Sequence, residues 1–586
     1  MAQMKHSKIP LSQTLVQLCK AKGIEHIVLS PGSRNAPLTI GFTHDDFFTC
    51  YSIVDERCAA FFALGIIQQI NKPVAVVCTS GSALLNYYPA VVEAFYSDLP
   101  LVVLSADRPK YFIGIGDGQT IDQQDVYANH ILYFANLKQD IDSSNKIDES
   151  HKLPIFKSFE NKLEKILGMQ KTIQQENESE INNALNICMT SRGPVHLNIP
   201  FDEPLYDKVE TPSVNPKNIP KESLPNLIEN IKGFAEKWNT SKKKMVLIGV
   251  NQPDLINEEY LEILANDKSV LVFTETTSNI HNDNFFPSID KIIAPLTEEE
   301  LKKLQPDILI TFGGMVVSKK IKAFLRDYKP VEHWHIDPKR ANDTFFCLSN
   351  HFKANVNVFF NEFKSQIEQV KSDYRTNWDH VKKRRSEKHE AYLKMISFSD
   401  FIGFDTILKS LPDNSNVQVG NSSAIRYTQL FDLNKTLKVY CNRGTSGIDG
   451  CTSTAIGSAV MSIDQTILIT GDLSFFYDSN ALWNNYIPNN FRIIVVNNSG
   501  GGIFRILPGH KNTANFDIYF ETKHNLTAEH LCKMYQFDYC KASNENQLKS
   551  QLSSFYSNSE RPKLLEVFTP RTKNDEILLN YFKFIK

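Results

Sequence analysis

Short apolar, β-rich runs recur from one end of the chain to the other, and segments with helical periodicity separate them. The runs are residues 26–30, 74–80, 101–106, 195–199, 245–250, 270–274, 308–312, 333–336, 417–420, 437–441, 466–470, 493–497 and 564–568. Strands that alternate with helices are typical of parallel sheets with crossover helices. The pattern therefore predicts an α/β fold made of three consecutive doubly wound domains with mostly parallel sheets.

Two polar stretches divide these runs into groups. Five prolines lie among charged residues between 204 and 225, which is typical of an interdomain linker. A strongly charged stretch follows the second group of runs and predicts a helix and connector. We expect a first domain over 1–203, a linker over 204–225, a central α/β domain over 226–365, a charged helical connector over 366–400 and a third domain over 401–586.

The charge balance argues against a nucleic-acid or membrane partner. Lys+Arg number 64 and Asp+Glu 66, so a net charge of -2 creates no overall field for an anionic polymer or surface. No stretch approaches the roughly 18 apolar residues that a membrane span needs. The ten cysteines form no C-x-x-C pair, and residues 1–23 resemble an amphipathic helix rather than a signal peptide. We expect a cytoplasmic protein that binds no nucleic acid and is not inserted in a membrane.

Polar residues follow two consecutive strands of the last group. Gly471-Asp472-Leu473-Ser474 ends one run, and Asn498 follows the next. Asp472, Asn498 and the backbone carbonyl of Gly500 can give Mg²⁺ three oxygen ligands, and diphosphate oxygens and water can complete the octahedron. Each feature alone is better explained as a helix cap or an ordinary turn. Their occurrence together at the ends of neighbouring strands favours a site for a diphosphate cofactor.

This pair of motifs resembles the diphosphate-binding signature of thiamine-diphosphate enzymes. The resemblance implies a second domain with a glutamate that contacts the aminopyrimidine ring, and Glu56 in Asp55-Glu56-Arg57 fits that position. A salt-bridged glutamate in the first turn of a helix is the alternative. As a carboxylic acid in a largely apolar site, Glu56 would donate to a ring nitrogen and favour the reactive tautomer. Ile448 matches the residue that holds the cofactor in its bent form.

A closer resemblance rests on Ser30-Pro31-Gly32-Ser33-Arg34, Ala106-Asp107-Arg108-Pro109 and the segment from Cys441 to Gly450. With the cofactor motifs, these are similar to the 2-succinyl-5-enolpyruvyl-6-hydroxy-3-cyclohexene-1-carboxylate synthase family over about residues 10–570. Acetolactate synthases lack the Ser-Pro-Gly-Ser-Arg segment. The resemblance implies a transferase of menaquinone biosynthesis that decarboxylates 2-oxoglutarate and adds the succinyl carbanion equivalent to isochorismate. The first domain would bind the pyrimidine, and the third the diphosphate.

The resemblance also assigns roles to individual residues. The catalytic residues would be Glu56, Arg34, Gln119 and Arg443. Thiamine diphosphate would contact Glu56, Thr79, Ser80, Gly81, Ser446, Ile448, Gly471, Asp472, Leu473, Ser474, Asn498, Gly500 and Gly501. Mg²⁺, which Mn²⁺ can replace, would be bound by Asp472, Asn498 and Gly500. The substrates would contact Ser33, Arg34, Arg108, Gln119, Lys319, Lys320, Ser422, Arg426, Arg443, Ile503, Phe504 and Leu507.

Physical chemistry agrees with the cationic part of this set. The two substrates carry four carboxylates and only one leaves as CO₂, so their site needs several guanidinium or ammonium groups. Lys320 stands where some relatives have an arginine. A plain core role is nearly as good an explanation for Ile503, Phe504 and Leu507. The glycine-rich segment 114–118 lacks a dinucleotide-binding context, and His333-Trp334-His335 is typical of structural histidines.

The resemblance further implies a homodimer or homotetramer with active sites at the subunit interface. Two other functions stay open. One is a different thiamine-diphosphate 2-oxoacid decarboxylase or carboligase, similar to acetolactate synthase. The other is a non-catalytic relative, against which the joint presence of Glu56, Asp472 and Asn498 argues.

Overall fold

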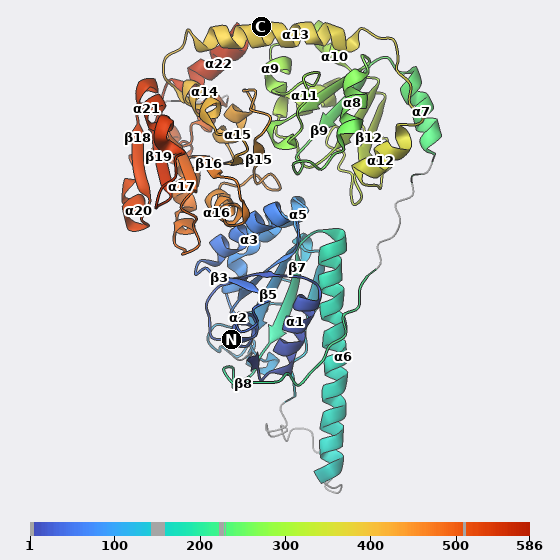
Figure 1. The fold of residues 1–586 in the computed structure, drawn as a ribbon, viewed down its shortest axis with the longest axis vertical. Coiled ribbons are helices and arrows are strands. Elements are labelled where there is room, and N and C mark those ends of the chain that lie inside the picture. Colours follow the sequence, from blue (N-terminus) through green and yellow to red (C-terminus); the bar gives the residue numbers. More distant parts are fainter. Residues whose placement is uncertain (1–4, 142–158, 222–227, 229, 508–510, 512) are drawn as a thin grey trace. The chain divides into compact units, whose positions relative to one another are not determined.

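The computed structural model describes residues 5–141, 159–221, 228, 230–507, 511 and 513–586 (Figure 1). The chain divides into two compact units. Unit 1 comprises Met1–Ser223 with Ile456–Met461 and Trp483–Tyr486, and unit 2 comprises the remainder. Three large sheets are present, and all of their strand pairs are parallel. The predicted α/β fold is therefore confirmed, although two of the three sheets belong to one compact unit.

Unit 1 is built on a six-stranded sheet of order β3-β2-β4-β5-β7-β6. Its strands are β2 (His26–Leu29), β3 (Thr49–Ser52), β4 (Val74–Cys78), β5 (Leu101–Asp107), β6 (Tyr133–Asn136) and β7 (Val195–Pro200). The helices of this unit are α1 (Pro10–Ala21), α2 (Ala36–Thr43), α3 (Glu56–Ile70), α4 (Ala83–Asn86), α5 (Tyr88–Tyr96) and α6 (Phe159–Ser191). β4 and β5 are buried throughout, because helices cover both faces of a doubly wound sheet.

The proline-rich segment 204–225 is held on unit 1 as far as the structure describes it. Its β8 (Lys208–Val209) pairs antiparallel with β1 (His6–Ser7). Further along, the backbone N–H of Ile219 donates to Asn182 over 2.9 Å, and Asn186 donates to the Ile219 carbonyl over 2.8 Å. The predicted linker is thus a strap along unit 1 up to residue 221, because side-chain amides satisfy its backbone groups. Residues 222–225 lie outside the described residues.

Unit 2 contains two sheets. The five-stranded central sheet has the order β10-β9-β11-β12-β13, and the six-stranded third sheet β15-β14-β16-β17-β19-β18. The strands are β9 (Lys244–Ile248), β10 (Val270–Thr274), β11 (Ile308–Phe312), β12 (Glu332–Ile336), β13 (Asn350–Phe352), β14 (Asn416–Val419), β15 (Lys438–Tyr440), β16 (Thr466–Gly471), β17 (Arg492–Asn497), β18 (Asp538–Ala542) and β19 (Lys563–Phe568).

Helices that begin at residue 231 or later surround both of these sheets, and one of them, α16 (Cys451–Met461), contributes its end Ile456–Met461 to unit 1. They are α7 (Ile231–Thr240), α8 (Glu258–Asn266), α9 (Ile289–Ile293), α10 (Glu298–Leu304), α11 (Lys319–Asp327), α12 (Val356–Phe363), α13 (Tyr374–Leu393), α14 (Asp400–Ser410), α15 (Ser423–Thr428), α16 (Cys451–Met461), α17 (Asp472–Tyr477), α18 (Ile503–Ile506), α19 (Ala514–Tyr519), α20 (Glu529–Met534), α21 (Glu545–Phe555) and α22 (Asn574–Phe584). No helix among the residues that the structure describes is long and apolar enough to cross a membrane.

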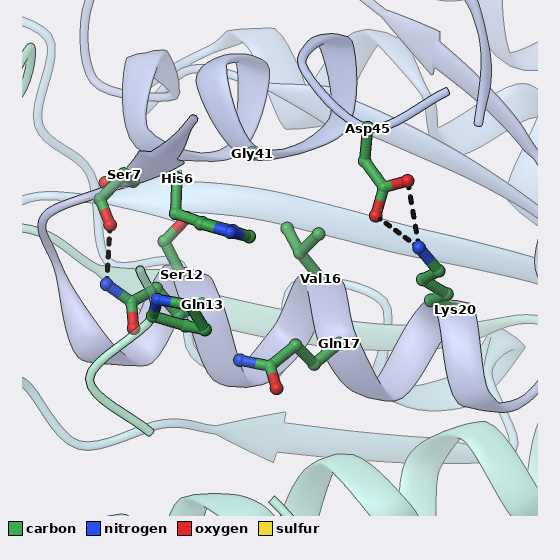
Figure 2. A pocket seen from close by; sticks show the side chains of 10 residues that line it. His6, Ser7, Ser12, Gln13, Val16, Gln17, Lys20, Gly41 and Asp45 are labelled. Atoms are coloured by element: carbon green, nitrogen blue, oxygen red, sulfur yellow. Dashed lines mark hydrogen bonds and ion pairs between the residues drawn. The ribbon is translucent and has the colours of Figure 1, made fainter. Parts of the chain in front are cut away.

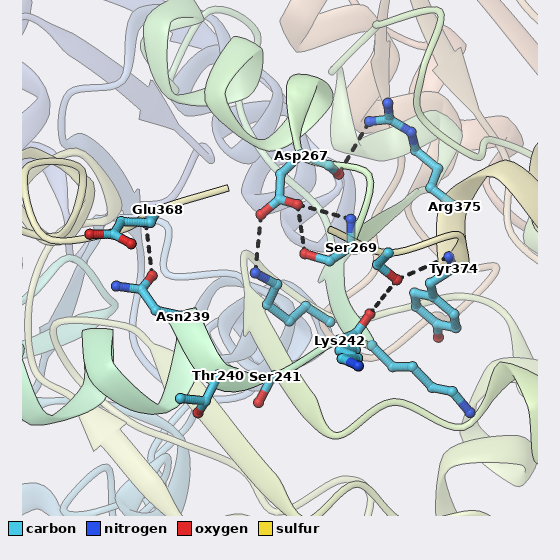
Figure 3. Close-up of polar contacts among 12 residues, drawn as sticks. Asn239, Thr240, Ser241, Lys242, Asp267, Ser269, Glu368, Tyr374 and Arg375 are labelled. Atoms are coloured by element: carbon cyan, nitrogen blue, oxygen red, sulfur yellow. Dashed lines mark hydrogen bonds and ion pairs between the residues drawn. The ribbon is translucent and has the colours of Figure 1, made fainter. Parts of the chain in front are cut away.

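A buried ion pair anchors the first strand of the central sheet. Lys244 is fully buried, and its Nζ lies 3.0 Å from Asp267 Oδ2 and 4.6 Å from the centre of the Trp238 ring. The other oxygen of Asp267 accepts from the backbone N–H and the hydroxyl of Ser269, as Figure 3 shows. Burial lowers the pKa of Lys244, and Asp267 opposes that shift. The polar groups of this pair are therefore bonded, as burial of charge requires.

The charged connector over 366–400 contains the predicted helix, α13 (Figure 1). His389 Nδ1 lies 2.8 Å from the hydroxyl of Tyr581, and Tyr392 donates to the Ile577 carbonyl over 2.7 Å, so α13 packs on α22. In the central sheet, His333 and His335 both contact the hydroxyl of Thr311, at 2.9 and 2.8 Å. These contacts support the structural interpretation of the two histidines.

A fully buried histidine lies in the sheet of unit 1. His196 of β7 places Nε2 2.6 Å from the Ser105 hydroxyl of β5, and its ring packs beside Tyr127 and Phe134. Burial lowers the pKa of His196 to about 3. In the folded protein the His196 imidazole therefore stays neutral down to about pH 3. In the unfolded chain the same imidazole is protonated below its ordinary pKa of about 6.5.

We expect the stability of the protein to fall as the pH drops from 6.5 towards 3, because only the unfolded state protonates His196 in that range. Between pH 7 and pH 4.5 this group alone accounts for about 3 kcal/mol. His196→Gln should flatten the slope of unfolding free energy against pH in urea denaturation. His530→Gln, at an exposed histidine, is the control. Equal slopes for wild type and His196→Gln would contradict a neutral buried imidazole.

Candidate functional site

The predicted pyrimidine-binding residues of unit 1 come together at the carboxyl edge of its sheet, in the loops that follow β2, β4 and β5. Gly32 lies against Thr79, so close that a Cβ on Gly32 would be 2.3 Å from the Thr79 Cβ. The Ser80 hydroxyl donates to the Gln119 carbonyl over 3.0 Å, and the Gly81 N–H donates to Gln123 Oε1 over 3.0 Å. Ligands bind at such edges because the strand ends leave a crevice there.

Two predicted substrate-binding arginines belong to the same loops. Arg34 is 6% exposed, and its Nη1 donates to the Phe201 carbonyl over 3.0 Å. Burial and then the charge of Arg108 lower the pKa of Arg34. Its Nε is buried without a hydrogen-bond partner in the described part of the chain. A buried guanidinium with a free N–H donor is suited to bind an anion. Ser33 and Gln119 are exposed on the same loops.

Glu56 is the first residue of α3. The Asp55 side chain caps this helix by accepting from the Cys58 N–H over 3.1 Å. Glu56 is half-buried, and its Oε2 accepts from Asn86 Nδ2 over 3.1 Å. Asn86 is thus a polar neighbour of Glu56 in unit 1. The role of Glu56 towards a cofactor stays a prediction.

A cavity of about 350 Å³ lies elsewhere in unit 1, along α1 and α2. Figure 2 shows that its polar groups bond to one another: Lys20 pairs with Asp45, and Gln13 donates to the Ser7 carbonyl. None of the predicted site residues lines this cavity. It is therefore not the predicted site.

The predicted diphosphate site is a cavity of about 180 Å³ in unit 2. It opens at the carboxyl ends of β14, β16 and β17, which are neighbours in the third sheet. The predicted residues that line it are Ser422, Ile448, Gly471, Asp472, Leu473, Ser474, Asn498, Gly500, Gly501, Ile503 and Phe504. The structure thus brings together residues from four separate stretches of sequence, among them the two motifs at the strand ends.

The three residues proposed to bind a cation, Asp472, Asn498 and Gly500, all line this cavity. Asp472 Oδ2 accepts from the Gly500 N–H over 3.0 Å and lies 3.3 Å from His524 Nε2. Asn498 is 8% exposed, and its Oδ1 is buried with no hydrogen-bond partner in the described part of the chain. A buried carbonyl oxygen of this kind is costly unless a ligand satisfies it. The buried Asn498 oxygen, in the same cavity as the Asp472 carboxylate, therefore suits a hard cation, and its binding by Asp472, Asn498 and Gly500 stays a prediction.

A carboxylate, an amide and a backbone carbonyl supply only three oxygen ligands, and the octahedron of Mg²⁺ needs further ones. Among the described residues, no cluster of three or more His, Cys, Asp or Glu side chains could hold a metal ion. Mg²⁺ is usually bound by one or two carboxylates together with substrate phosphates. The site therefore suits a cation that arrives with a diphosphate better than a free ion.

Gly500 brings the backbone close to this centre. Its φ is +145°, and a Cβ at this position would lie 2.6 Å from the Glu521 carbonyl oxygen. That carbonyl accepts from the Gly501 N–H over 2.6 Å. Glu521 is itself held by Arg505 and Arg571, with Arg505 Nη2 2.7 Å from Glu521 Oε2. Only glycine satisfies both the conformation and the close approach.

Asn421 organises the loop that carries Ile448. Its Nδ2 donates to the carbonyls of Asn442 and Gly447, each over 2.7 Å, and its Oδ1 accepts from Arg443 over 2.8 Å. The Ser474 hydroxyl donates to the Ile448 carbonyl over 3.0 Å. Ile448 is thereby fixed on the wall of the cavity. Ser446 of the same loop has a φ of +62° and does not line the cavity.

The predicted cationic residues of unit 2 form a second group. Arg426 donates to the Ser422 carbonyl over 2.8 Å, and the charge of Arg443, after burial, lowers the pKa of Arg426. Burial raises the pKa of Asp290, whereas the charges of Lys320 and Arg426 lower it, so these three residues are close enough to interact. Arg443 is 8% exposed with a buried Nε that has no hydrogen-bond partner in the described residues. Lys319 and Lys320 are exposed at the start of α11.

Glu275, at the end of β10, connects the lysine-bearing helix to the arginines. Its carboxylate accepts from the N–H groups of Val317 and Ser318, over 2.6 and 2.7 Å, directly before α11 begins. Burial raises the pKa of Glu275 to about 7, while those two backbone bonds and the Arg443 charge act in the opposite direction. The central sheet thus supplies a fixed position for Lys319 and Lys320.

The three apolar residues predicted for the ring of a substrate lie on and after α18. Ile503 and Phe504 line the cavity, and Leu507 does not. Phe504 is 37% exposed and Leu507 46%. A core role is therefore wrong for Phe504 and Leu507, and a contact surface for a ligand stays the prediction.

Several residues of the site were not predicted, and three of them, Asn421, Glu275 and Asp400, form hydrogen bonds that hold other site groups in place. Asn421 and Glu275 each follow a predicted strand directly, so the same strand-end signal could have found them. Asp400, at the start of α14, lines the cavity, and burial raises its pKa to about 6, with Asp472 adding to the rise. No sequence signal identifies Asp400, because it lies 98 positions from Asn498, the cavity residue to which it is bonded.

Comparisons with known proteins identify the family of the chain. The N-terminal binding domain of thiamine pyrophosphate (thiamine diphosphate) enzymes matches residues 9–126, and the C-terminal one residues 418–567. Three relatives are named 2-succinyl-5-enolpyruvyl-6-hydroxy-3-cyclohexene-1-carboxylate synthase. The protein of Christiangramia forsetii is 56% identical over all of both chains. Those of Flavobacterium psychrophilum and Flavobacterium johnsoniae are 54% and 52% identical over 99% of this chain and all of theirs. The chain belongs to this synthase family of thiamine-diphosphate enzymes.

Proposed function

We propose that this transferase decarboxylates 2-oxoglutarate and adds the succinyl unit in conjugate fashion to isochorismate, a step of menaquinone biosynthesis. The observation that carries the proposal is the cavity at the ends of β14, β16 and β17, with its unsatisfied Asn498 oxygen beside Asp472. Full-length similarity to synthases of this name supports the choice of substrates.

The residues of the cavity would hold thiamine diphosphate and Mg²⁺, for which Mn²⁺ can substitute. Asp472, Asn498 and the Gly500 carbonyl would bind the cation, and the glycine backbone would approach the diphosphate. When bound, the cofactor supplies a nucleophilic carbon and an electron sink for loss of CO₂. Glu56 would hold a proton at its carboxyl and donate it to the aminopyrimidine ring. Ile448 would support the bent form of the cofactor.

The cationic groups would bind the carboxylates that the two substrates retain. Arg443 and Arg34 are buried, and the Nε of each has no hydrogen-bond partner in the described residues, so each can donate to a carboxylate oxygen without first breaking a bond. Preorganised donors of this kind contribute to catalysis because they need not reorganise when the substrate binds. Arg108, Arg426, Lys319 and Lys320 would add charge, and Ser33, Gln119 and Ser422 neutral hydrogen bonds.

We also propose a homo-oligomer with active sites at the subunit interface, because the resemblance to the family implies this arrangement. A cytoplasmic location fits as well, since no disulfide joins any two of the cysteines, all of which are described.

Loss of isochorismate absorbance tests the proposed reaction. The purified protein should consume isochorismate only when Mg²⁺, thiamine diphosphate and 2-oxoglutarate are all present. Glu56→Gln should lower the rate by about a hundredfold or more, because an amide cannot supply the acidic proton. Glu25→Gln, at a partly exposed glutamate just before β2, is the matched control and should keep the wild-type rate.

A protein that binds the cofactor but leaves isochorismate unchanged would contradict these substrates. A panel of other 2-oxoacids would then test the decarboxylase or carboligase similar to acetolactate synthase. Failure to bind thiamine diphosphate at all would instead favour a non-catalytic relative.

Arg443→Lys tests the proposed carboxylate contact. Lysine keeps the charge and loses the planar fork, so kcat/KM for one of the two acids should fall about 10- to 100-fold while the cofactor affinity stays within about twofold. Arg326→Lys, at an exposed arginine of α11, should behave as wild type. Steady-state kinetics with each substrate varied in turn would measure both. An unchanged kcat/KM for both acids would exclude Arg443 from substrate binding.

A further inference from the structure

The amide of Asn498 faces two different surroundings. Its Nδ2 donates to Asp400 Oδ2 over 3.0 Å, and its Oδ1 is the buried oxygen without a partner in the described residues. An amide can turn about its last bond and exchange these two atoms. Only one of the two orientations offers an oxygen to a cation; the other offers an NH₂ group, which repels it.

Asp400 is fixed by three separate contacts at the start of α14. It is 2% exposed, and its backbone N–H donates to Asn574 Oδ1 over 2.9 Å. The Thr569 hydroxyl donates to Asp400 Oδ1 over 2.5 Å, which leaves Oδ2 for Asn498. Both carboxylate oxygens of Asp400 therefore accept hydrogen bonds from protein side chains.

Both Asp400 oxygens act as acceptors, Oδ1 for the Thr569 hydroxyl and Oδ2 for Asn498 Nδ2. An acceptor oxygen can pair with the amide only through Nδ2, so Asn498 Oδ1 points the other way. Because the bond is buried, turning the amide would leave both of its partners unsatisfied. Groups behind a metal ligand commonly fix the ligand's orientation in this manner.

We infer that Asp400 is a positioning residue that holds the Asn498 amide with its oxygen towards the cation. The inference rests on the proposed function, which makes Asn498 a ligand of Mg²⁺ in the diphosphate site. It gives the buried Asp400 a role that neither its sequence position nor the cofactor motifs assign.

The substitution Asp400→Asn tests this positioning role most directly. If Thr569 continues to donate to residue 400, the new amide turns its NH₂ group towards Asn498. Asn498 must then offer its oxygen to residue 400 and its own NH₂ group to the cation. We expect the affinity for Mn²⁺ in the presence of thiamine diphosphate to fall at least about tenfold. The free-Mn²⁺ signal in electron paramagnetic resonance measures this binding without any turnover.

Asp405→Asn is the matched control. Asp405 lies on the same helix, outside the cavity lining, and pairs with Lys409 over 2.7 Å. Its replacement removes an equal charge from α14 and should leave Mn²⁺ affinity within about twofold of wild type.

The double variant Asp400→Asn with Asn498→Asp exchanges the two side chains. The amide at position 400 can then accept from Thr569 and donate to the carboxylate at position 498, whose second oxygen faces the cation. Mn²⁺ affinity should recover to within about threefold of wild type. A merely structural role for Asp400 predicts no such recovery. The double variant therefore distinguishes a structural role from a positioning role even if Asp400→Asn does not fold.

The outcomes separate the inference from the proposed function. Wild-type protein that binds no Mn²⁺ with thiamine diphosphate would overturn the proposed metal site and the inference with it. Wild-type binding with an unchanged affinity in Asp400→Asn would overturn the inference alone. Loss of affinity in the folded single variant with no recovery in the double variant, or equal loss in Asp405→Asn, would also overturn it. Loss in Asp400→Asn and recovery in the double variant would support it.

Discussion

The site of unit 2 depends on the parallel order of β14, β16 and β17. Strands that run in one direction end at the same edge, so the residues that follow them meet there although they are far apart in the chain. Gly471 ends β16, Asn497 ends β17, and the segment after β14 carries Asn421 and Ser422. The parallel strand order thus places a carboxylate, an amide and a glycine backbone within one cavity.

This rule explains why much of the fold and the cavity could be predicted. The thirteen apolar runs match strands to within two residues at each end, because a strand buried on both faces must be apolar along its whole length. Strands such as β3 (Thr49–Ser52) and β18 (Asp538–Ala542) were missed. They are edge strands in their sheets and carry polar or charged residues, so they lack the continuous apolar signal.

Contacts between residues far apart in the sequence could not be predicted. Asp400 and Asn498 are joined only by the packing of α14 beside the end of β17, and no local spacing records that contact. The hydrogen bonds that hold the proline-rich segment on unit 1 could not be predicted for a similar reason. Prolines remove donors and favour extended backbone, but whether that backbone is free or bonded depends on partners such as Asn182 and Asn186 elsewhere in the chain.

The polar groups of unit 2 differ in whether their bonds are already complete. Lys244 and Asp267 satisfy one another and their neighbours, so that pair acts within the fold. Arg443 Nε and Asn498 Oδ1 are equally buried but lack partners among the described residues. An unsatisfied buried polar atom costs about 1–3 kcal/mol, so a ligand that bonds to either atom gains that free energy on binding. Asn421 holds Arg443 and Asp400 holds Asn498, so neither unsatisfied atom can rotate towards another partner in the protein. The unsatisfied atoms are therefore the part of the fold that is organised for binding.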